Sequence, residues 1–387
     1  MSQKNVKPTI YLALVDDWEL RGDGSGDMER IQFQSMRELV RIFNAHGIKG
    51  SFNAEVMQQL SFRKFEGRRP ELKRLADEWD AVALETFRQG HDVQLHVHPQ
   101  WREAQYENGK WLLTADWSIL KHDPQDAYRM METCKEYLEK LLRPIDPHYR
   151  CISFRSGAWC IAPSPHILRL LVRLGIVFDM SIVGGAQYDT RHVQLDYTNC
   201  EEDFLPYYPV MEDARKVSRQ KEEIICVPTN QFYSSRRYIF KKQLGKVRDK
   251  VKARLKPAPS VHDNQTGAQN YYQEWAEANP PTSKLRRIFQ NSIVPYKSGY
   301  HLISDISLLD YELLGEMLES IRRRARATGL SEVPIILENH TKDLTNFSHI
   351  ERFAADLARA ADIKCVTLTQ LGRELADGRF FIKTSRT

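Results

Sequence analysis

Apolar and polar residues alternate with a period of two in several short segments, and recur at helical spacing in the longer segments between them. Residues 9–15 form an apolar run that predicts a buried strand, and residues 28–46 carry apolar positions at helical spacing. Further strands are predicted at 50–54, 93–98, 151–154, 176–183, 223–227, 300–304, 333–337 and 363–367, and helices at 70–88, 126–142, 165–174, 309–327 and 347–361. This alternation is typical of parallel βαβ units arranged as a barrel or an open sheet.

The segment between Gly90 and Pro99 has the clearest alternation, GHDVQLHVHP. Side chains two residues apart on a strand share a face, so His96 and His98 should point the same way. Pro99 cannot donate a ladder hydrogen bond and is expected to mark the end of the strand. Two imidazoles at a strand end are half of a metal site, and the alternative is a pair of surface histidines on an edge strand.

Composition narrows the class of protein. The chain has 387 residues, which suffices for one large α/β domain with an insertion, and its 42% hydrophobic and 28% charged residues are ordinary for a soluble protein. No apolar run is long enough to span a bilayer. The six cysteines form no CxxC pair, which predicts free thiols, a reducing compartment and a cytoplasmic location.

A basic stretch interrupts the pattern between residues 232 and 295. Its first part, RRYIFKKQLGKVRDKVKARLK, holds a single acid, Asp249. We predict a solvated insertion or linker, 232–295, in one α/β domain formed by 1–231 and 296–387. The alternative is a basic face, 236–256, that contacts an anionic membrane surface. The net charge of +5 is mild, and no nucleic-acid partner is expected.

Polar residues follow the predicted strands repeatedly. In parallel α/β folds functional residues gather where strands end. The candidates at these positions are Asp16, Asp17, His96, His98, Arg155, Asp179, Ser181, Asp305, Glu338, Asn339 and His340.

These motifs, in this order, resemble those of the polysaccharide deacetylase, or NodB-homology, family of carbohydrate esterases. The matching stretches are LVDDW at Asp16-Asp17, GHDVQLHVHP at the histidines, FRSGAW at Arg155, FDMSIV at Asp179 and PIILENHT at His340. The resemblance implies a deformed (β/α) barrel of about seven strands. It also implies one divalent metal ion, expected to be zinc, held by Asp17, His96 and His98.

Three departures from the family pattern stand out. The histidines are spaced His-x-His where the family has His-x-x-x-His, and Ser156-Gly157 follows Arg155 where the family has Pro. The family's Asp-Trp element before the last His is absent, so Asp305 and Asp179 are both candidates for its role.

The reaction that the resemblance implies is metal-assisted hydrolysis of an N-acetyl amide on a carbohydrate, soluble or lipid-linked. Asp16 would act as general base, fixed by Arg155, and His340 as general acid, oriented by Asp305 or Asp179.

Three tryptophans near strand ends, Trp18, Trp101 and Trp159, are candidate sugar-stacking walls, with ordinary packing as the alternative for each. Other functions stay open at this point: a different metal hydrolase, of the amidohydrolase or PHP-phosphoesterase type, a deacetylase-fold enzyme acting on a non-sugar amide, or a non-catalytic glycan-binding homologue.

Overall fold

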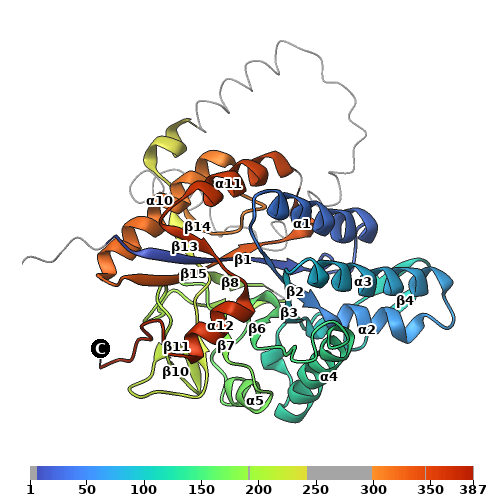
Figure 1. Ribbon diagram of the computed structural model, residues 1–387. Helices are drawn as coiled ribbons and strands as arrows, with labels where there is room; N and C mark the ends of the chain where they lie inside the picture. The colour runs from blue at the N-terminus through green and yellow to red at the C-terminus, as the bar shows by residue number, and fades with distance from the viewer. Residues whose placement is uncertain (1–6, 191, 242–298, 345, 387) are drawn as a thin grey trace, which may run out of the picture.

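A sheet of parallel strands forms the centre of the molecule (Figure 1). The computed structural model describes residues 7–190, 192–241, 299–344 and 346–386. The strands follow the order β12-β7-β6-β3-β2-β1-β15, and β16 also pairs with β1. Their bounds are β1 (Thr9–Trp18), β2 (Ser51–Glu55), β3 (Asp92–Val97), β6 (Ser153–Ser156), β7 (Phe178–Asp179), β12 (Ile225–Cys226), β15 (Glu332–Asn339) and β16 (Ile363–Cys365).

The two ends of this sheet meet. Thr229, three residues after β12, forms a parallel bridge with Ile336 of β15, and the Asn230 amide donates to the Ile336 carbonyl at 2.9 Å. β15 pairs with one edge of β1, while the other edge of β1 pairs first with β16 and then with β2. Seven strands therefore curl into a deformed (β/α) barrel, and the predicted fold class is confirmed.

Helices pack around the barrel, among them α1, α10 and α11 along one side of β1 (Figure 1). They are η1 (Glu29–Gln34), α1 (Ser35–Ala45), α2 (Val56–Phe65), α3 (Pro70–Arg88), α4 (Pro124–Leu142), α5 (Ile167–Arg173), α10 (Tyr311–Thr328), α11 (Phe347–Arg359) and α12 (Leu368–Ala376). The predicted helix 28–46 is divided into a π-helical turn, η1, and α1. Helices α2 and α12 were not predicted.

Two predicted strands differ from the structure. The strand predicted at 176–183 is only the two-residue β7. The strand predicted at 300–304 is β14 (His301–Ile303), which pairs antiparallel with β13 (Gln231–Tyr233) outside the barrel sheet. Further short antiparallel pairs are β4 (Gln105–Glu107) with β5 (Lys110–Leu112), β8 (Gln187–Asp189) with β9 (Gln194–Asp196), and β10 (Pro209–Val210) with β11 (Asp213–Val217).

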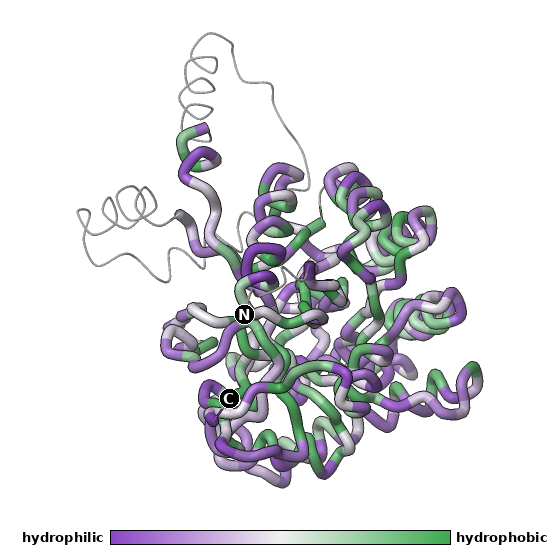
Figure 2. The backbone as a smooth tube through the Cα atoms, turned by 60° about the vertical axis from the view of Figure 1, so that its left-hand side comes forward, coloured by the Kyte–Doolittle hydropathy of each residue, from purple (hydrophilic) through white to green (hydrophobic). Residues whose placement is uncertain are grey.

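Alternate residues of β1 belong to two separate cores. Tyr11, Ala13 and Val15 join the core that α12 fills, whereas their even-numbered neighbours join the core under the outer helices. Figure 2 shows the banding of apolar and polar turns along these outer helices. The start of α12 lies at the beginning of β2 and β3, because the Leu368 amide donates to Ser51 Oγ and the Thr369 amide donates to Asp92. α12 therefore plugs the end of the barrel where strands begin and leaves the other end for the polar residues.

Some predictions are tested only in part. The basic stretch lies outside the described residues from 242 onward, so the domain division and the membrane contact stay predictions. No described helix is both long enough and apolar enough to cross a membrane. All six cysteines are free thiols.

Candidate metal and catalytic site

Polar residues face inward where the barrel strands end. The odd-numbered, inward positions of β1 continue past Val15 to Asp17 and Glu19, and a residue at every second position of a strand shares its face. In register, Asp17 lies opposite Asn53, while Glu55 lies opposite His96 on the neighbouring strand. The inward set comprises Asp17, Glu19, Asn53, Glu55, His96, His98, Arg155, Glu338 and His340, and each of these residues is at most 9% exposed.

One half of the site, here called the imidazole cluster, comprises Glu19, Glu55, His96 and His98. One ligand atom from each residue lies within 4.8 Å of the others. His98 Nε2 is 2.6 Å from Glu19 Oε2 and 2.9 Å from His96 Nε2, and the third side, from His96 Nε2 to Glu19 Oε2, measures 3.3 Å. These three atoms form a triangle small enough for one ion to touch all of them at bonds of about 2.0–2.2 Å.

The other ring nitrogens hold the two imidazoles in place. His96 Nδ1 lies 2.8 Å from the Arg155 carbonyl oxygen, which can only accept, so Nδ1 carries the hydrogen and Nε2 of the neutral ring keeps its lone pair. His98 Nδ1 accepts a hydrogen bond from Gln100 Nε2 at 2.8 Å. Rotation of this amide by 180° would present its oxygen, which has no partner, to Nδ1 and give His98 the same tautomer as His96. Partners of this kind are what orient imidazole ligands in metal sites.

The two carboxylates of the imidazole cluster differ in charge. Burial alone would raise the pKa of Glu19, but the positive charges of His98 and Lys342 hold that pKa well below its usual value, and Lys342 contacts Glu19 Oε1 directly. Burial raises the pKa of Glu55 to about 8. Its Oε1 accepts the Gln58 amide hydrogen, while Oε2 is buried without a partner. The donor set and this orphan oxygen fit a divalent cation.

The other half of the site, here called the arginine cluster, comprises Asp17, Arg155, Asp305, Glu338 and His340. Arg155 Nη1 donates to Asp17 Oδ1 at 2.8 Å and lies 3.6 Å from Glu338 Oε1. Despite burial, Arg155 with His96 and His340 lowers the pKa of Asp17 to about 2. Asp17, Glu338 and His340 also place ligand atoms within 4.8 Å of one another, but the guanidinium between the carboxylates already supplies their positive charge.

His340 is held by Asp305. Its Nδ1 lies 2.6 Å from Asp305 Oδ2. Burial alone would lower the pKa of His340, but the Asp305 charge raises it to about 10, so the ring is an imidazolium at neutral pH. Burial raises the pKa of the neighbouring Glu338 to about 7, against the opposing effect of Arg155.

Asp17 connects the two clusters. Its Oδ1 accepts hydrogen bonds from Arg155 and from Asn53, the latter at 2.9 Å. Its other oxygen, Oδ2, lies 3.9 Å from His96 Nε2 and 3.8 Å from His340 Nε2. A group placed between these two imidazoles would therefore face a free carboxylate oxygen.

The predicted contacts of the first strand's aspartates need correction. Arg155 binds Asp17, so the prediction that it fixes Asp16 is wrong. Asp16 has the opposite parity, and its carboxylate accepts a hydrogen bond from Asn339 at the rim between β1 and β15. Burial raises the pKa of Asp16 well above its usual value. The division of base and ligand roles between the two aspartates is not tested by these contacts.

The structure also chooses between the two candidates for orienting His340. Asp305 makes that contact, whereas Asp179 accepts hydrogen bonds from the hydroxyl and amide of Ser181, at 2.7 and 3.0 Å. Ser181 Oγ in turn accepts from the Ser156 amide, one residue after Arg155. Asp179 therefore braces the end of β6, and its predicted contact with His340 is wrong.

Of the three tryptophans, only Trp159 lies beside the site. Trp18 has outward parity and is fully buried, stacked on Trp79 with ring centroids 4.7 Å apart. Trp101 is 3% exposed and packs on Phe62 and Trp111. Neither can stack on a sugar without repacking, so both predictions are wrong.

Trp159 occupies a constrained position. It and Ala158 both have positive φ, 57° and 51°, a conformation that costs a non-glycine residue free energy and persists where the surroundings impose it. Its Nε1 donates to Glu338 Oε1 at 2.9 Å, and its ring lies edge-on to His340 with centroids 6.4 Å apart. Trp159 is half-buried, so part of the indole faces solvent.

The departure at Ser156-Gly157 has a steric explanation. A Cβ built at Gly157 would lie 2.8 Å from the Val97 carbonyl oxygen and 3.0 Å from the His98 ring. Glycine therefore lets the chain after Arg155 pass directly beside His98.

Sequence reasoning missed several site residues: Glu19, Asn53, Glu55, Thr229 and Lys342. Glu19 stands two residues after Asp17, as His98 stands two residues after His96, so spacing along the strand could have found it. Glu55 directly follows the predicted strand 50–54. Thr229, which accepts from Arg155 Nη2 at 2.9 Å, follows β12 without any sequence signal.

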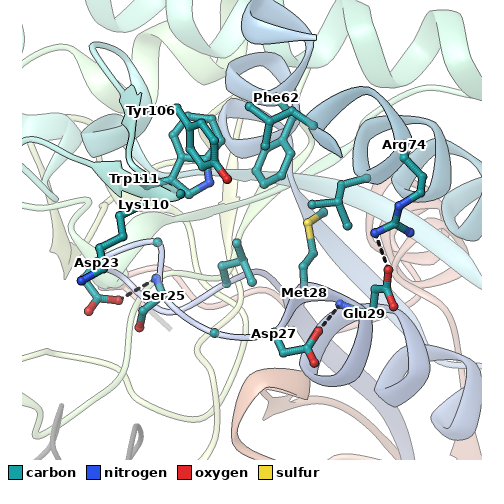
Figure 3. Close-up of a pocket in the computed structure, with 16 residues that line it drawn as sticks. Asp23, Ser25, Asp27, Met28, Glu29, Phe62, Arg74, Tyr106, Lys110 and Trp111 are labelled. Atoms are coloured by element: carbon teal, nitrogen blue, oxygen red, sulfur yellow. Dashed lines mark hydrogen bonds and ion pairs between the residues drawn. The ribbon is translucent and has the colours of Figure 1, made fainter. Parts of the chain in front are cut away.

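A hollow lies beside the loop that follows β1. This cavity of about 600 Å³ is bordered by the loop after β1, by α2 and α3, and by the β4–β5 hairpin (Figure 3). Figure 3 shows Asp23 and Asp27 on the loop and Trp111 on the hairpin. The two aspartates accept hydrogen bonds from nearby backbone amides of their own loop, Asp23 from Ser25 and Asp27 from Glu29.

No family model and no curated protein matches this sequence. In structure, the chain is similar to a protein described as a polysaccharide deacetylase from Mycobacterium smegmatis, at 12% identity and a TM-score of 0.48, over 98% of this chain and 94% of that one. It is also similar to PuuE allantoinase, at 13% identity and a TM-score of 0.44, over 97% and 93% of the two chains.

A third similar structure is 4-alpha-glucanotransferase from Thermococcus litoralis, at 11% identity and a TM-score of 0.48. This chain aligns over 94% of its own length and spans 40% of that enzyme. Likeness at this level says nothing about which reaction this chain catalyses.

Proposed function

We propose that this chain is a metal-dependent amide hydrolase that removes N-acetyl groups from a sugar or polysaccharide. One observation carries the proposal: a triangle of ligand atoms and an acid–base pair, Asp17 and His340, meet at the same open end of the barrel. The motif resemblance supplies the choice of an acetylated sugar.

Glu19, His96 and His98 would hold the ion, with Glu19 in the place that the sequence suggested for Asp17. Their ligand atoms are 2.6–3.3 Å apart, whereas Asp17 Oδ2 is 3.9 Å from the nearer imidazole and its other oxygen is engaged by Arg155. A bound divalent ion supplies Lewis-acid polarisation of the acyl oxygen and a more acidic water.

Asp17 is the general base in this proposal. Arg155 and Asn53 fix one oxygen, and the free Oδ2 faces the space between His96 and His340. With a pKa of about 2, Asp17 is ionised throughout the neutral range. It can therefore accept a proton from a water molecule beside the ligand atoms of Glu19, His96 and His98. Asp16 has the opposite parity and accepts a hydrogen bond from Asn339, so the proposal gives it no direct part in proton transfer.

His340 is the general acid. An amine is too basic to leave as an anion, so its nitrogen must be protonated as the C–N bond breaks. The imidazolium of His340, kept charged by Asp305, carries that proton on Nε2, the nitrogen that faces Asp17. Trp159, pinned to Glu338 beside His340, offers an aromatic surface for the sugar ring.

Substitution of neighbouring carboxylates tests the assignment. We expect Glu19→Gln to lose the metal, and Asp17→Asn to keep the metal and bind substrate while turnover falls about 100- to 10,000-fold. Asp16→Asn, at the adjacent position of opposite parity, is the control and should keep the metal. Because the Asp16 charge acts on His340, we expect a fall in turnover that is much smaller than the fall in Asp17→Asn. Metal analysis by mass spectrometry, with kinetics on an N-acetylated oligosaccharide, measures both effects.

If Asp17→Asn loses the metal and Glu19→Gln keeps it, the ligands are Asp17, His96 and His98, as the motif resemblance implied. Unchanged turnover in both variants would refute the deacetylase proposal.

A further inference from the structure

We infer that Glu55 is a fourth protein ligand, so that the ion is held by two carboxylates and two imidazoles. This inference rests on the proposed metal site and goes beyond the ligand set of one carboxylate and two histidines that the motif resemblance implies. The first evidence is position: Glu55 is the last residue of β2 and pairs in register with His96 on β3.

A role as a helix cap accounts for only one of the two carboxylate oxygens of Glu55. Oε1 accepts the Gln58 amide hydrogen at the start of α2, as a helix N-cap does. Oε2 is buried and has no partner, although Glu55 is 0% exposed. An unsatisfied buried carboxylate oxygen is costly. The Glu55 carboxyl group also places an oxygen within 4.8 Å of the ligand atoms of Glu19, His96 and His98.

The charge balance of the imidazole cluster also favours Glu55 as a ligand. The four residues of the imidazole cluster are between 0 and 6% exposed, so a divalent ion there has little water to compensate it. Lys342 contacts Glu19 and offsets the negative charge of that carboxylate. The Glu55 carboxyl group, once it binds the ion as a carboxylate, would supply the missing negative charge.

The donor types indicate the class of ion. Carboxylate oxygens and imidazole nitrogens together suit first-row divalent ions such as Mn²⁺, Co²⁺ and Zn²⁺.

The test compares metal affinities of the full-length protein. Apo wild type, Glu55→Gln and Glu338→Gln are titrated with Mn²⁺ and Co²⁺ by chelator competition. Glutamine keeps the cap to Gln58, and Glu338 is the matched control, because it is an equally buried glutamate with an unpartnered Oε2 that lies beside Arg155.

We expect Glu55→Gln to weaken binding by more than the ~100-fold that loss of an outer partner can cost, and Glu338→Gln to stay within that range. A loss of ~100-fold or less in Glu55→Gln overturns the inference. Glu19→Gln separates the two proposals: if it loses metal while Glu55→Gln does not, only the fourth ligand fails. If neither loses metal, the proposed function fails as well.

Anomalous diffraction from wild-type crystals grown with Mn²⁺ gives a result that does not depend on variants folding. A manganese peak within about 2.0–2.3 Å of Glu55 Oε2 supports the fourth ligand, and a peak beyond bonding distance overturns it.

Discussion

The imidazole cluster and the arginine cluster are built from the same residue types at the same end of the barrel, yet they suit different chemistry. Each contains buried carboxylates and at least one histidine. In the arginine cluster, Arg155 lies between Asp17 and Glu338 and supplies one positive charge to both. In the imidazole cluster, two ring nitrogens face each other 2.9 Å apart beside carboxylate oxygens. One buried guanidinium therefore distinguishes the proposed proton-transfer site from the proposed cation site.

This difference shows why a list of acidic and histidine residues does not identify a metal site. Both clusters place three or more potential ligand atoms within 4.8 Å of one another. The imidazole cluster has no arginine or lysine among its four members, and Lys342 contacts it from outside at Glu19 Oε1. The predictions below disturb each cluster in turn.

The largest expected effect on stability comes from removing Arg155. Arg155→Met leaves Asp17 and Glu338 buried without their shared positive charge, which typically costs about 3–5 kcal/mol. Urea unfolding of metal-free protein measures the loss. Arg37→Met is the control, since Arg37 pairs with Glu78 and Glu85 at the surface and its loss should cost about 0–1 kcal/mol. Equal losses in the two variants would contradict the comparison.

The dependence of activity on pH tests whether the arginine cluster keeps His340 protonated. The folded-state pKa of His340 is raised from its usual 6.5 to about 10. Its stabilising contribution is therefore complete below pH 6.5 and is lost as pH rises toward 10. If His340 must be protonated, kcat/KM should stay level through neutral pH and fall as pH approaches 10.

Asp305→Asn removes the charge that raises this pKa, so the alkaline fall should move to lower pH and activity at pH 9 should drop about tenfold or more. Asp179→Asn is the matched control, because Asp179 bonds to Ser181 and not to His340. If the fall of kcat/KM at high pH moves in Asp179→Asn and not in Asp305→Asn, then Asp179 and not Asp305 raises the pKa of His340.

Much of the fold could be predicted from periodicity, because a strand buried on one face and an amphipathic helix leave different spacings. Helix α3 was predicted at its observed bounds. Helix α2 was missed because it begins at Val56 directly after β2, so no loop residues separate the two elements in the sequence. The pairing of β14 with β13 was missed because spacing identifies a strand and says nothing about its partner.

Parity explains which of the predicted contacts the structure shows and which it corrects. His96 and His98 share a face, as their spacing predicted, and Asp305 does contact His340. The same rule, applied to β1, would have grouped Asp17 with Glu19 and turned Asp16 outward. The motif resemblance, with its adjacent aspartates, directed attention away from that parity.

Other parts of the site could not be predicted from the sequence. Contacts such as Arg155 with Thr229 join residues 74 positions apart, and depend on how the barrel closes at Ile336. Lys342 follows His340 in a 3₁₀ turn, and its contact with Glu19 needs β1 and β15 to be neighbours.

The smallest expected effect concerns the aromatic surface beside the arginine cluster. Trp159→Phe keeps a ring near His340 but removes the indole donor that binds Glu338 at 2.9 Å. A hydrogen bond of this kind contributes about 1 kcal/mol, so KM for an N-acetylated oligosaccharide should rise about fivefold, with kcat changed less. Trp101→Phe is the control: Trp101 is 3% exposed against Phe62, so its replacement should lower the melting temperature and leave KM unchanged. An equal rise in KM in both variants would mean that Trp159 acts through packing alone, and an unchanged KM in Trp159→Phe would remove the indole donor from substrate recognition.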